Sequence, residues 1–276
     1  MLKRVLLWIF AIVITLFAAV FQRLTGPTHP KRVEYKIEDS TYKVKLPRSG
    51  ESTMDCILSL VLPDSANATL KFRRYPTNDD FAQVQFVKSD NGKCEAFLPK
   101  MPAAGKLEYY VEINTSTQNI PLFKEEPIII RFKDSVPAWA LIPHIFIMFF
   151  AMMFSNIAGL MAAFNVKSFK TYGLIAIATM FIGGFVFGPI IQQYAFGQAW
   201  TGFPLGHDLT DNKTLIAFVA WMFAVAMNWK KDRPWATVIA SIVTIVIFSI
   251  PHSLRGSELN YESGKVVTGF IMNFIR

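Results

Sequence analysis

The chain has 276 residues, of which 52% are hydrophobic and 17% are charged, and its formal net charge at pH 7 is +8. Its apolar residues gather in long stretches without charge, which favours membrane spans over one large soluble core. In a membrane protein an excess of basic residues usually lies near helix ends and sets orientation. Because no run of Lys and Arg alternates with aromatic residues, nucleic acid is not expected as a partner.

The first apolar segment covers residues 6–21, LLWIFAIVITLFAAVF, and follows Lys3 and Arg4. A basic start before an apolar stretch is also typical of a secretory signal peptide. This stretch is longer than the usual apolar part of a signal peptide, and no clear Ala-x-Ala cleavage site follows it. We therefore predict an uncleaved transmembrane anchor over residues 1–26, with a signal peptide as the alternative. Either one sends the next segment across the membrane.

Residues 27–135 are polar and mixed in charge, without a long apolar run. Short segments of alternating apolar and polar residues follow one another at regular spacing, separated by turn-forming residues. We predict strands in seven of them: 33–39, 55–62, 68–75, 82–88, 93–99, 106–113 and 127–133. Seven short strands in roughly one hundred residues predict an extracytoplasmic β-sandwich.

One stretch of this domain, CEAFLPKMPAAGKLEYYVEI at residues 94–113, carries a family resemblance. It resembles the final hairpin of immunoglobulin-like and fibronectin type III-like domains, in which a strand ending in Leu-Pro is followed by a turn and a Tyr-rich strand. The resemblance covers this domain only. It implies an immunoglobulin-like fold and no particular activity.

The two cysteines of the chain, Cys56 and Cys94, both fall on predicted strands of this domain. An extracytoplasmic location permits a disulfide. Their spacing is shorter than that of the usual inter-sheet pair of antibody domains, and no Trp lies between them. A disulfide and a pair of buried free thiols both remain open.

Four further apolar segments follow, at residues 139–164, 172–191, 214–229 and 236–250, and none contains Asp, Glu, Lys or Arg. We predict an α-helical bundle of five spans with the sandwich inserted after the first. The four later spans form a membrane domain over residues 136–252, with an outer loop at 192–213. Gly184 and Gly188 suggest close helix packing, within the chain or against a second copy. Residues 253–276 are predicted to form an outer hairpin, turning at 262–264, and a tail.

Three clusters of basic residues set the orientation. They fall on one side if the spans alternate, and by the positive-inside rule that side is the cytoplasm. The prediction is a multi-pass protein of the inner (plasma) membrane, with the sandwich, the 192–213 loop and the C-terminus extracytoplasmic. The clusters are Lys3 and Arg4; Lys167 and Lys170; and Lys230, Lys231 and Arg233.

This orientation places three histidines at the outer rim of the membrane: His144, His207 and His252. Ionisable groups at membrane depth are costly and usually face the bundle interior. Imidazole is the commonest metal ligand, and Asp208 and Asp211 add oxygen donors beside His207. These five residues are the predicted ligands of a transition metal, with copper, zinc and iron as candidates. Alternatively, His144 and His252 ligate a b-type haem axially.

Plainer interpretations exist for each residue. Asp211 or Thr210 can cap the fourth span, His144 can hydrogen-bond a neighbouring helix, and His252 can contact lipid headgroups. The rival function is a non-catalytic subunit that recruits extracytoplasmic partners through its immunoglobulin-like domain and packs against other membrane proteins. A third possible function is that of a small-molecule channel or exporter. Without a HExxH, phosphate-loop or G-x-S-x-G motif, the sequence assigns no enzyme class.

Overall fold

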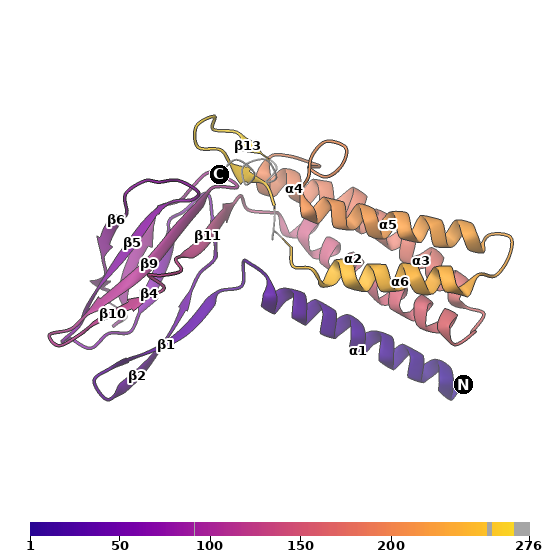
Figure 1. The fold of residues 1–276 in the computed structure, drawn as a ribbon, viewed down its shortest axis with the longest axis horizontal. Helices are drawn as coiled ribbons and strands as arrows, with labels where there is room; N and C mark the ends of the chain where they lie inside the picture. Colours follow the sequence, from indigo (N-terminus) through magenta and orange to yellow (C-terminus); the bar gives the residue numbers. More distant parts are fainter. Residues whose placement is uncertain (91, 253–255, 268–276) are drawn as a thin grey trace. The chain divides into compact units, whose positions relative to one another are not determined.

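The computed structural model describes residues 1–90, 92–252 and 256–267 and divides the chain into two compact units (Figure 1). The helical unit comprises Met1–Pro27 and Val136–Ser257, and the strand unit comprises Thr28–Ser135 and Glu258–Val267. The chain is therefore a mixed helix and sheet protein. The predicted tail beyond residue 267 lies outside the described residues.

Each of the five predicted apolar segments is helical, and four of these helices, by length and composition, can cross a membrane. The fifth, α6, is shorter, at 16 residues. The second and third apolar helices are separated by a short loop, and the third has a π-helical turn in its middle. In chain order the elements are α1 (Leu2–Thr25), α2 (Ala138–Ala163), α3 (Phe169–Phe181), η1 (Ile182–Phe187), α4 (Gly188–Phe196), α5 (Leu209–Asn228) and α6 (Pro234–Ser249).

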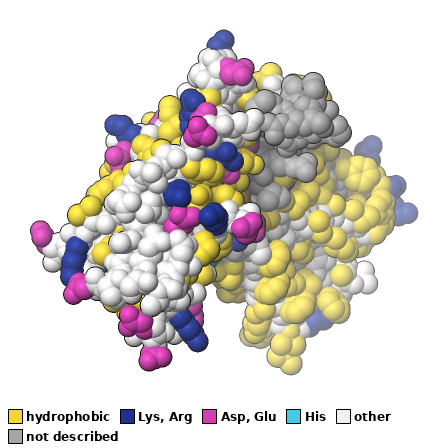
Figure 2. Space-filling model, turned by 60° about the vertical axis from the view of Figure 1, so that its left-hand side comes forward, with side chains coloured by type: hydrophobic (Ala, Val, Ile, Leu, Met, Phe, Trp, Pro, Cys, Tyr) yellow, Lys and Arg dark blue, Asp and Glu magenta, His cyan; other side chains and the backbone are white. Residues whose placement is uncertain are grey.

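Small and polar residues hold the helices together. The indole of Trp221 on α5 is 1% exposed, and its Nε1 donates to Ser155 Oγ on α2 (3.2 Å) and Thr244 Oγ1 on α6 (3.0 Å). A Cβ added to Gly184 would lie 2.3 Å from Thr214 Cγ2, so this glycine packs inside the chain, against α5. Large apolar side chains cover the outside of the helical unit, whereas charged side chains are spread over the strand unit (Figure 2).

The basic clusters predicted to share one side lie at one end of the helical unit. Lys3 Nζ donates to the carbonyl oxygen of Phe164 at 3.0 Å, which joins the start of α1 to the end of α2. Lys170, at the start of α3, forms an ion pair with Asp232, in the loop between α5 and α6. The three clusters therefore gather around the same helix ends.

The strand unit contains two antiparallel sheets and two hairpins, with one parallel pair, β3 and β11. The larger sheet has the order β3-β11-β9-β5-β6, with β10 also paired to β9, and the smaller has the order β4-β8-β7. All seven predicted strands are present, and β2, β3 and β10 were not expected. The strands are β1 (Lys31–Ile37), β2 (Ser40–Leu46), β3 (Ser49–Glu51), β4 (Cys56–Leu60), β5 (Asn67–Arg74), β6 (Ala82–Gln85), β7 (Val87–Lys88), β8 (Cys94–Leu98), β9 (Lys106–Asn114), β10 (Asn119–Leu122), β11 (Ile128–Lys133), β12 (Glu258–Leu259) and β13 (Val266–Val267).

Both sheets contribute to one apolar core. Leu58 and Leu98 of the smaller sheet pack in the same buried cluster as Leu70 and Tyr109 of the larger. Alternation along β4 and β8 places these side chains inward, because successive residues of a strand face opposite sides. The strand unit therefore has one core, to which both sheets and the β1–β2 hairpin contribute.

Cys56 and Cys94 are free thiols, and the register of β4 and β8 explains why they cannot pair. Cys56 lies opposite Leu98, and Cys94 lies opposite Leu60, at the two ends of the ladder. Four residue steps separate these ends, about 14 Å along a strand. A disulfide needs Cα atoms within roughly 7 Å, so the question left open by the sequence is resolved in favour of free thiols.

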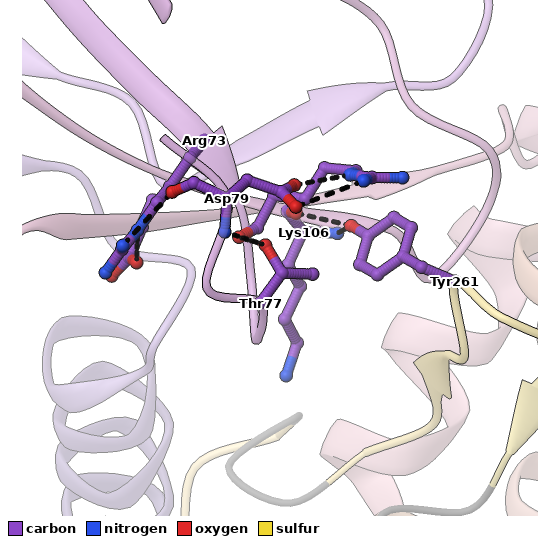
Figure 3. Close-up of polar contacts among 7 residues, drawn as sticks. Arg73, Thr77, Asp79, Lys106 and Tyr261 are labelled. Atoms are coloured by element: carbon purple, nitrogen blue, oxygen red, sulfur yellow. Dashed lines mark hydrogen bonds and ion pairs between the residues drawn. The ribbon is translucent and has the colours of Figure 1, made fainter. Parts of the chain in front are cut away.

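The predicted hairpin near the end of the chain is confirmed as β12 and β13, which pair antiparallel. The hydroxyl of Tyr261 accepts a hydrogen bond from the backbone N–H of Lys106 (2.8 Å) and donates one to the Lys106 carbonyl (Figure 3). Lys106 Nζ also forms an ion pair with Glu258, and the guanidinium of Arg74 lies over the Tyr261 ring. The hairpin is thus attached where β5 ends and β9 begins.

Candidate functional site

The loop before α5 is built around Asp211. Its Oδ2 accepts hydrogen bonds from the backbone N–H groups of Thr201 (2.7 Å) and Gly202 (3.1 Å) and from Thr201 Oγ1 (3.2 Å). Residue 202 has to be glycine, because an added Cβ would lie 2.6 Å from Asp211 Cβ. This carboxylate, predicted as a metal ligand or a helix cap, instead binds the loop to the first turn of α5.

Asp208 is the N-cap of α5. Its Oδ1 accepts from the Thr210 backbone N–H at 2.7 Å, which satisfies one of the free donors of the first turn. Its Oδ2 accepts from the backbone N–H (3.1 Å) and the hydroxyl (3.3 Å) of Ser257. Asp208 therefore ties the segment after α6 to the start of α5. The sequence placed the cap at Thr210 or Asp211, two or three residues too late.

The most unusual residue at this end of the helical unit is Lys213, whose side chain is 1% exposed. Its Nζ donates to the Ile250 carbonyl oxygen at 2.5 Å and lies in electrostatic range of Asp208. Gln22 Nε2 approaches the same oxygen at 3.4 Å. The uninterrupted apolar run begins only at Thr214, so the sequence pattern did not indicate Lys213. Asp208 is a residue type that often caps helices, and a cap at Asp208 starts the helix at residue 209. Lys213 then belongs to the helix and is buried in the bundle.

His144 is anchored through one ring nitrogen. Its Nδ1 lies 3.0 Å from the carbonyl oxygen of Gly183, in the π-helical turn η1. A carbonyl only accepts, so Nδ1 carries the proton and Nε2 keeps a lone pair. Metal-binding histidines commonly have this arrangement, in which the second nitrogen is held by a carbonyl. π-helical turns also recur at functional sites.

The His144 imidazole and the Lys213 ammonium group both lie in electrostatic range of His252. His252 itself is an exposed residue. These three side chains come from α2, from α5 and from the segment after α6. His207, the third predicted histidine, lies exposed in the loop before Asp208. We refer to His144, Lys213 and His252 as the polar cluster.

Among the residues that the structure describes, no three His, Cys, Asp or Glu side chains come close enough to hold a metal ion. The five-residue set His144, His207, His252, Asp208 and Asp211 is therefore not assembled as one centre there. Both aspartates are occupied with backbone donors instead. Of the predicted set, His144 and His252 remain in electrostatic range of each other, and His252 is also in range of the buried ammonium group of Lys213.

Comparison with known proteins adds no relative: no family model, no curated protein and no solved structure matches this chain. The fold and the site therefore define only a broad class, a mixed protein of apolar helices and antiparallel sheets with a polar cluster at one end of its helices.

Proposed function

We propose that the chain is an integral protein of the inner (plasma) membrane that crosses the bilayer five times. Two observations support this proposal. Four of the helices are long and apolar enough to span a membrane, and large apolar side chains lie on their outer surfaces. At 16 residues α6 is about 24 Å long and needs its flanking residues to cover a core of roughly 30 Å. The three basic clusters at one end mark the cytoplasmic side.

The strand unit then lies outside the cytoplasm, because an odd number of crossings separates it from the basic end. Two sheets with one shared core support an immunoglobulin-like sandwich for it. The polar cluster lies at the helix ends opposite the basic clusters. The site and the strand unit thus face the same compartment.

We further propose that the polar cluster holds a b-type haem between His144 and His252. The observation that carries this proposal is the hydrogen bond between His144 Nδ1 and the Gly183 carbonyl, which leaves Nε2 available as a ligand, together with a second imidazole in electrostatic range. Histidines on separate helices of a bundle are a common way to bind haem iron.

Haem fits this site better than a bare metal ion for two reasons. A haem iron needs only two axial ligands from the protein, whereas an ion bound by side chains needs three or four. The buried ammonium of Lys213 repels a bare cation, but it complements the two carboxylates that a haem carries. If His144 and His252 both held a haem iron, no coordination position would be left for a substrate. We therefore infer an electron-carrying function.

The test is the haem content of the purified chain, measured from its absorption spectrum. Wild-type protein should carry up to one haem per chain with the spectrum of a low-spin, two-histidine site. His144→Ala and His252→Ala should each lose most of it, while His207→Ala, in the exposed loop, should retain it. A wild-type chain that takes up no haem, even from added haemin, would overturn the haem proposal, as would full haem content in both variants.

A second candidate function, recruitment of an extracytoplasmic protein, is favoured by an apolar patch on the strand unit. Ile57 on β4 and Phe97 on β8 lie directly opposite each other, 54% and 48% exposed, and Val87 on β7 is 69% exposed. An exposed group of large apolar side chains often marks a protein contact. A photo-crosslinker at residue 97 should then give a discrete adduct in intact membranes, and one at the exposed Lys45 should not.

A further inference from the structure

A groove runs along the helical unit between α3 and α5, at the end that carries the basic clusters. Its first part, about 270 Å³, is lined by Gly173, Leu174, Trp221 and Trp229 among others. Its second part, about 660 Å³, shares Val225 and Trp229 with the first and reaches the loop after α5. Most of the lining is apolar. A groove with this volume and lining suits a hydrocarbon chain.

Basic side chains border the loop end of this groove. Lys230, Lys231 and Arg233 line its second part, and all three are exposed. Asp232, the acidic residue among them, is paired with Lys170 on the other wall. Three cationic side chains therefore line one part of a mostly apolar groove, and the Asp232 carboxylate among them is already paired.

The turn that presents these basic residues is preformed. Asn228, which is buried, donates from Nδ2 to the Ala224 carbonyl (2.8 Å) and to Thr237 Oγ1 (3.2 Å). Its Oδ1 accepts from the Arg233 backbone N–H at 2.7 Å. One amide side chain therefore fixes the end of α5, the turn and the start of α6. Binding at this turn needs little ordering of the backbone.

We propose that this groove binds one anionic phospholipid, with an acyl chain against Val225 and Trp229 and the phosphate group among Lys230, Lys231 and Arg233. The inference rests on the proposed membrane insertion, because only then does the groove open to lipid. Charge complementarity selects the occupant, since a zwitterionic lipid presents no net negative charge to three basic side chains. Basic sites between helices on the cytoplasmic side recognise acidic headgroups by this chemistry.

The experiment is native mass spectrometry of the full chain, freed of endogenous lipid and given equal amounts of phosphatidylglycerol and phosphatidylcholine with identical acyl chains. Wild type should retain phosphatidylglycerol with a preference of about tenfold or more, since each basic residue near an anionic group contributes roughly fivefold. Raising the salt concentration should weaken the preference. The variant Lys230→Gln, Lys231→Gln, Arg233→Gln should lose it.

A matched control changes the same number of charges at the same helix ends but outside the groove: Lys3→Gln, Arg4→Gln, Lys167→Gln. It should keep the preference. If the groove variant does not fold, the single changes Lys230→Gln and Lys231→Gln, both at exposed positions, should each reduce the preference roughly fivefold. Val225→Trp, which fills the groove, should lower retention of both lipids.

Equal retention of the two lipids by wild type would overturn the inference. A preference that survives in the groove variant, or that falls equally in the control, would also overturn it. These outcomes are distinct from failure of the proposed membrane insertion, which alkaline carbonate extraction of membranes reports separately. A chain released by carbonate without detergent would refute insertion itself.

Discussion

Lys213 donates a hydrogen bond to the Ile250 carbonyl oxygen, 2.5 Å away, and so joins the first turns of α5 to the end of α6. The ammonium group is buried, and burying such a charge is costly unless it is paired. Asp208 supplies part of the compensation. The carboxylates of a bound haem would supply the remaining compensation for the buried charge. Lys213 is therefore part of the proposed haem site.

Lys213→Met tests that interpretation. The variant keeps the length of the side chain but removes the charge, so haem affinity should fall by about tenfold or more, as expected for loss of a charge-assisted hydrogen bond. The shape of the absorption spectrum should stay the same, because the axial histidines are untouched. Lys167→Met, at an exposed position at the other end, should leave the affinity unchanged. Equal affinities in all three proteins would show that Lys213 is structural only.

Asp208→Ala should lower the thermal stability of the helical unit. The change removes the N-cap of α5, worth about 0.5–2 kcal/mol, and leaves the Ser257 backbone N–H without its acceptor. In a unit of this size a loss of 1 kcal/mol lowers Tm by roughly 2–4 °C. Asp208→Asn, which keeps a cap acceptor, should lose less. An unchanged Tm in the alanine variant would contradict the described cap.

Gly184→Ala should destabilise the packing of η1 against α5. The new methyl group would lie 2.3 Å from Thr214 Cγ2, far inside van der Waals contact. Thr214→Ser removes that Cγ2 atom, so the double variant should recover most of the loss in Tm. Overpacking in a core typically costs about 1–3 kcal/mol. If Thr214→Ser gave no rescue, the two residues would not be in contact.

Glu112 gives the strand unit a dependence on acid pH. Its carboxylate pairs with Lys71 at 2.8 Å and with Lys124 at 3.0 Å, and the hydrogen bond from Lys71 is the main cause that lowers its pKa from the ordinary 4.5. A lowered folded-state pKa stabilises the fold above pH 4.5, and this contribution disappears as pH falls through the folded value. Glu112→Gln should therefore lower Tm at pH 7, and its difference from wild type should shrink as pH falls below 4.5.

The control for that comparison is Glu34→Gln on the β1–β2 hairpin, where the partner Lys43 and the carboxylate are both well exposed. Exposed pairs contribute little, so its Tm should follow wild type at every pH. A constant offset between Glu112→Gln and wild type from pH 7 to pH 3 would mean that the charge of Glu112 does not stabilise the unit.

The sequence was most informative where hydrophobic pattern dictates structure. The apolar runs predicted the helices, and period-two alternation predicted all seven strands that it was applied to. It failed at β2 (Ser40–Leu46), where STYKVKL has alternation but follows a turn of only two residues, Glu38 and Asp39. It also did not anticipate the π-helical turn, because no local pattern distinguishes IGGFVF from an ordinary helix.

The candidate site was predictable only in part. The order of the predicted spans placed His144 and His252 at one end of the helices, and in the structure the two lie in electrostatic range of each other. The positions of Asp208 and Asp211 depend on where α5 begins and on which backbone N–H groups the loop presents, and neither follows from composition. Lys213 was missed for the same reason. Its burial is a consequence of a helix start five residues earlier than the apolar run suggests.

The proposed function is tested most directly by the electron paramagnetic resonance spectrum of the oxidised chain after loading with haem. Ligation by His144 and His252 predicts a low-spin ferric signal in wild type and in His207→Ala, and a high-spin signal when either His144 or His252 is replaced by alanine. A low-spin signal that persists in both of those variants, or a wild-type chain that cannot be loaded, would contradict the two-histidine site.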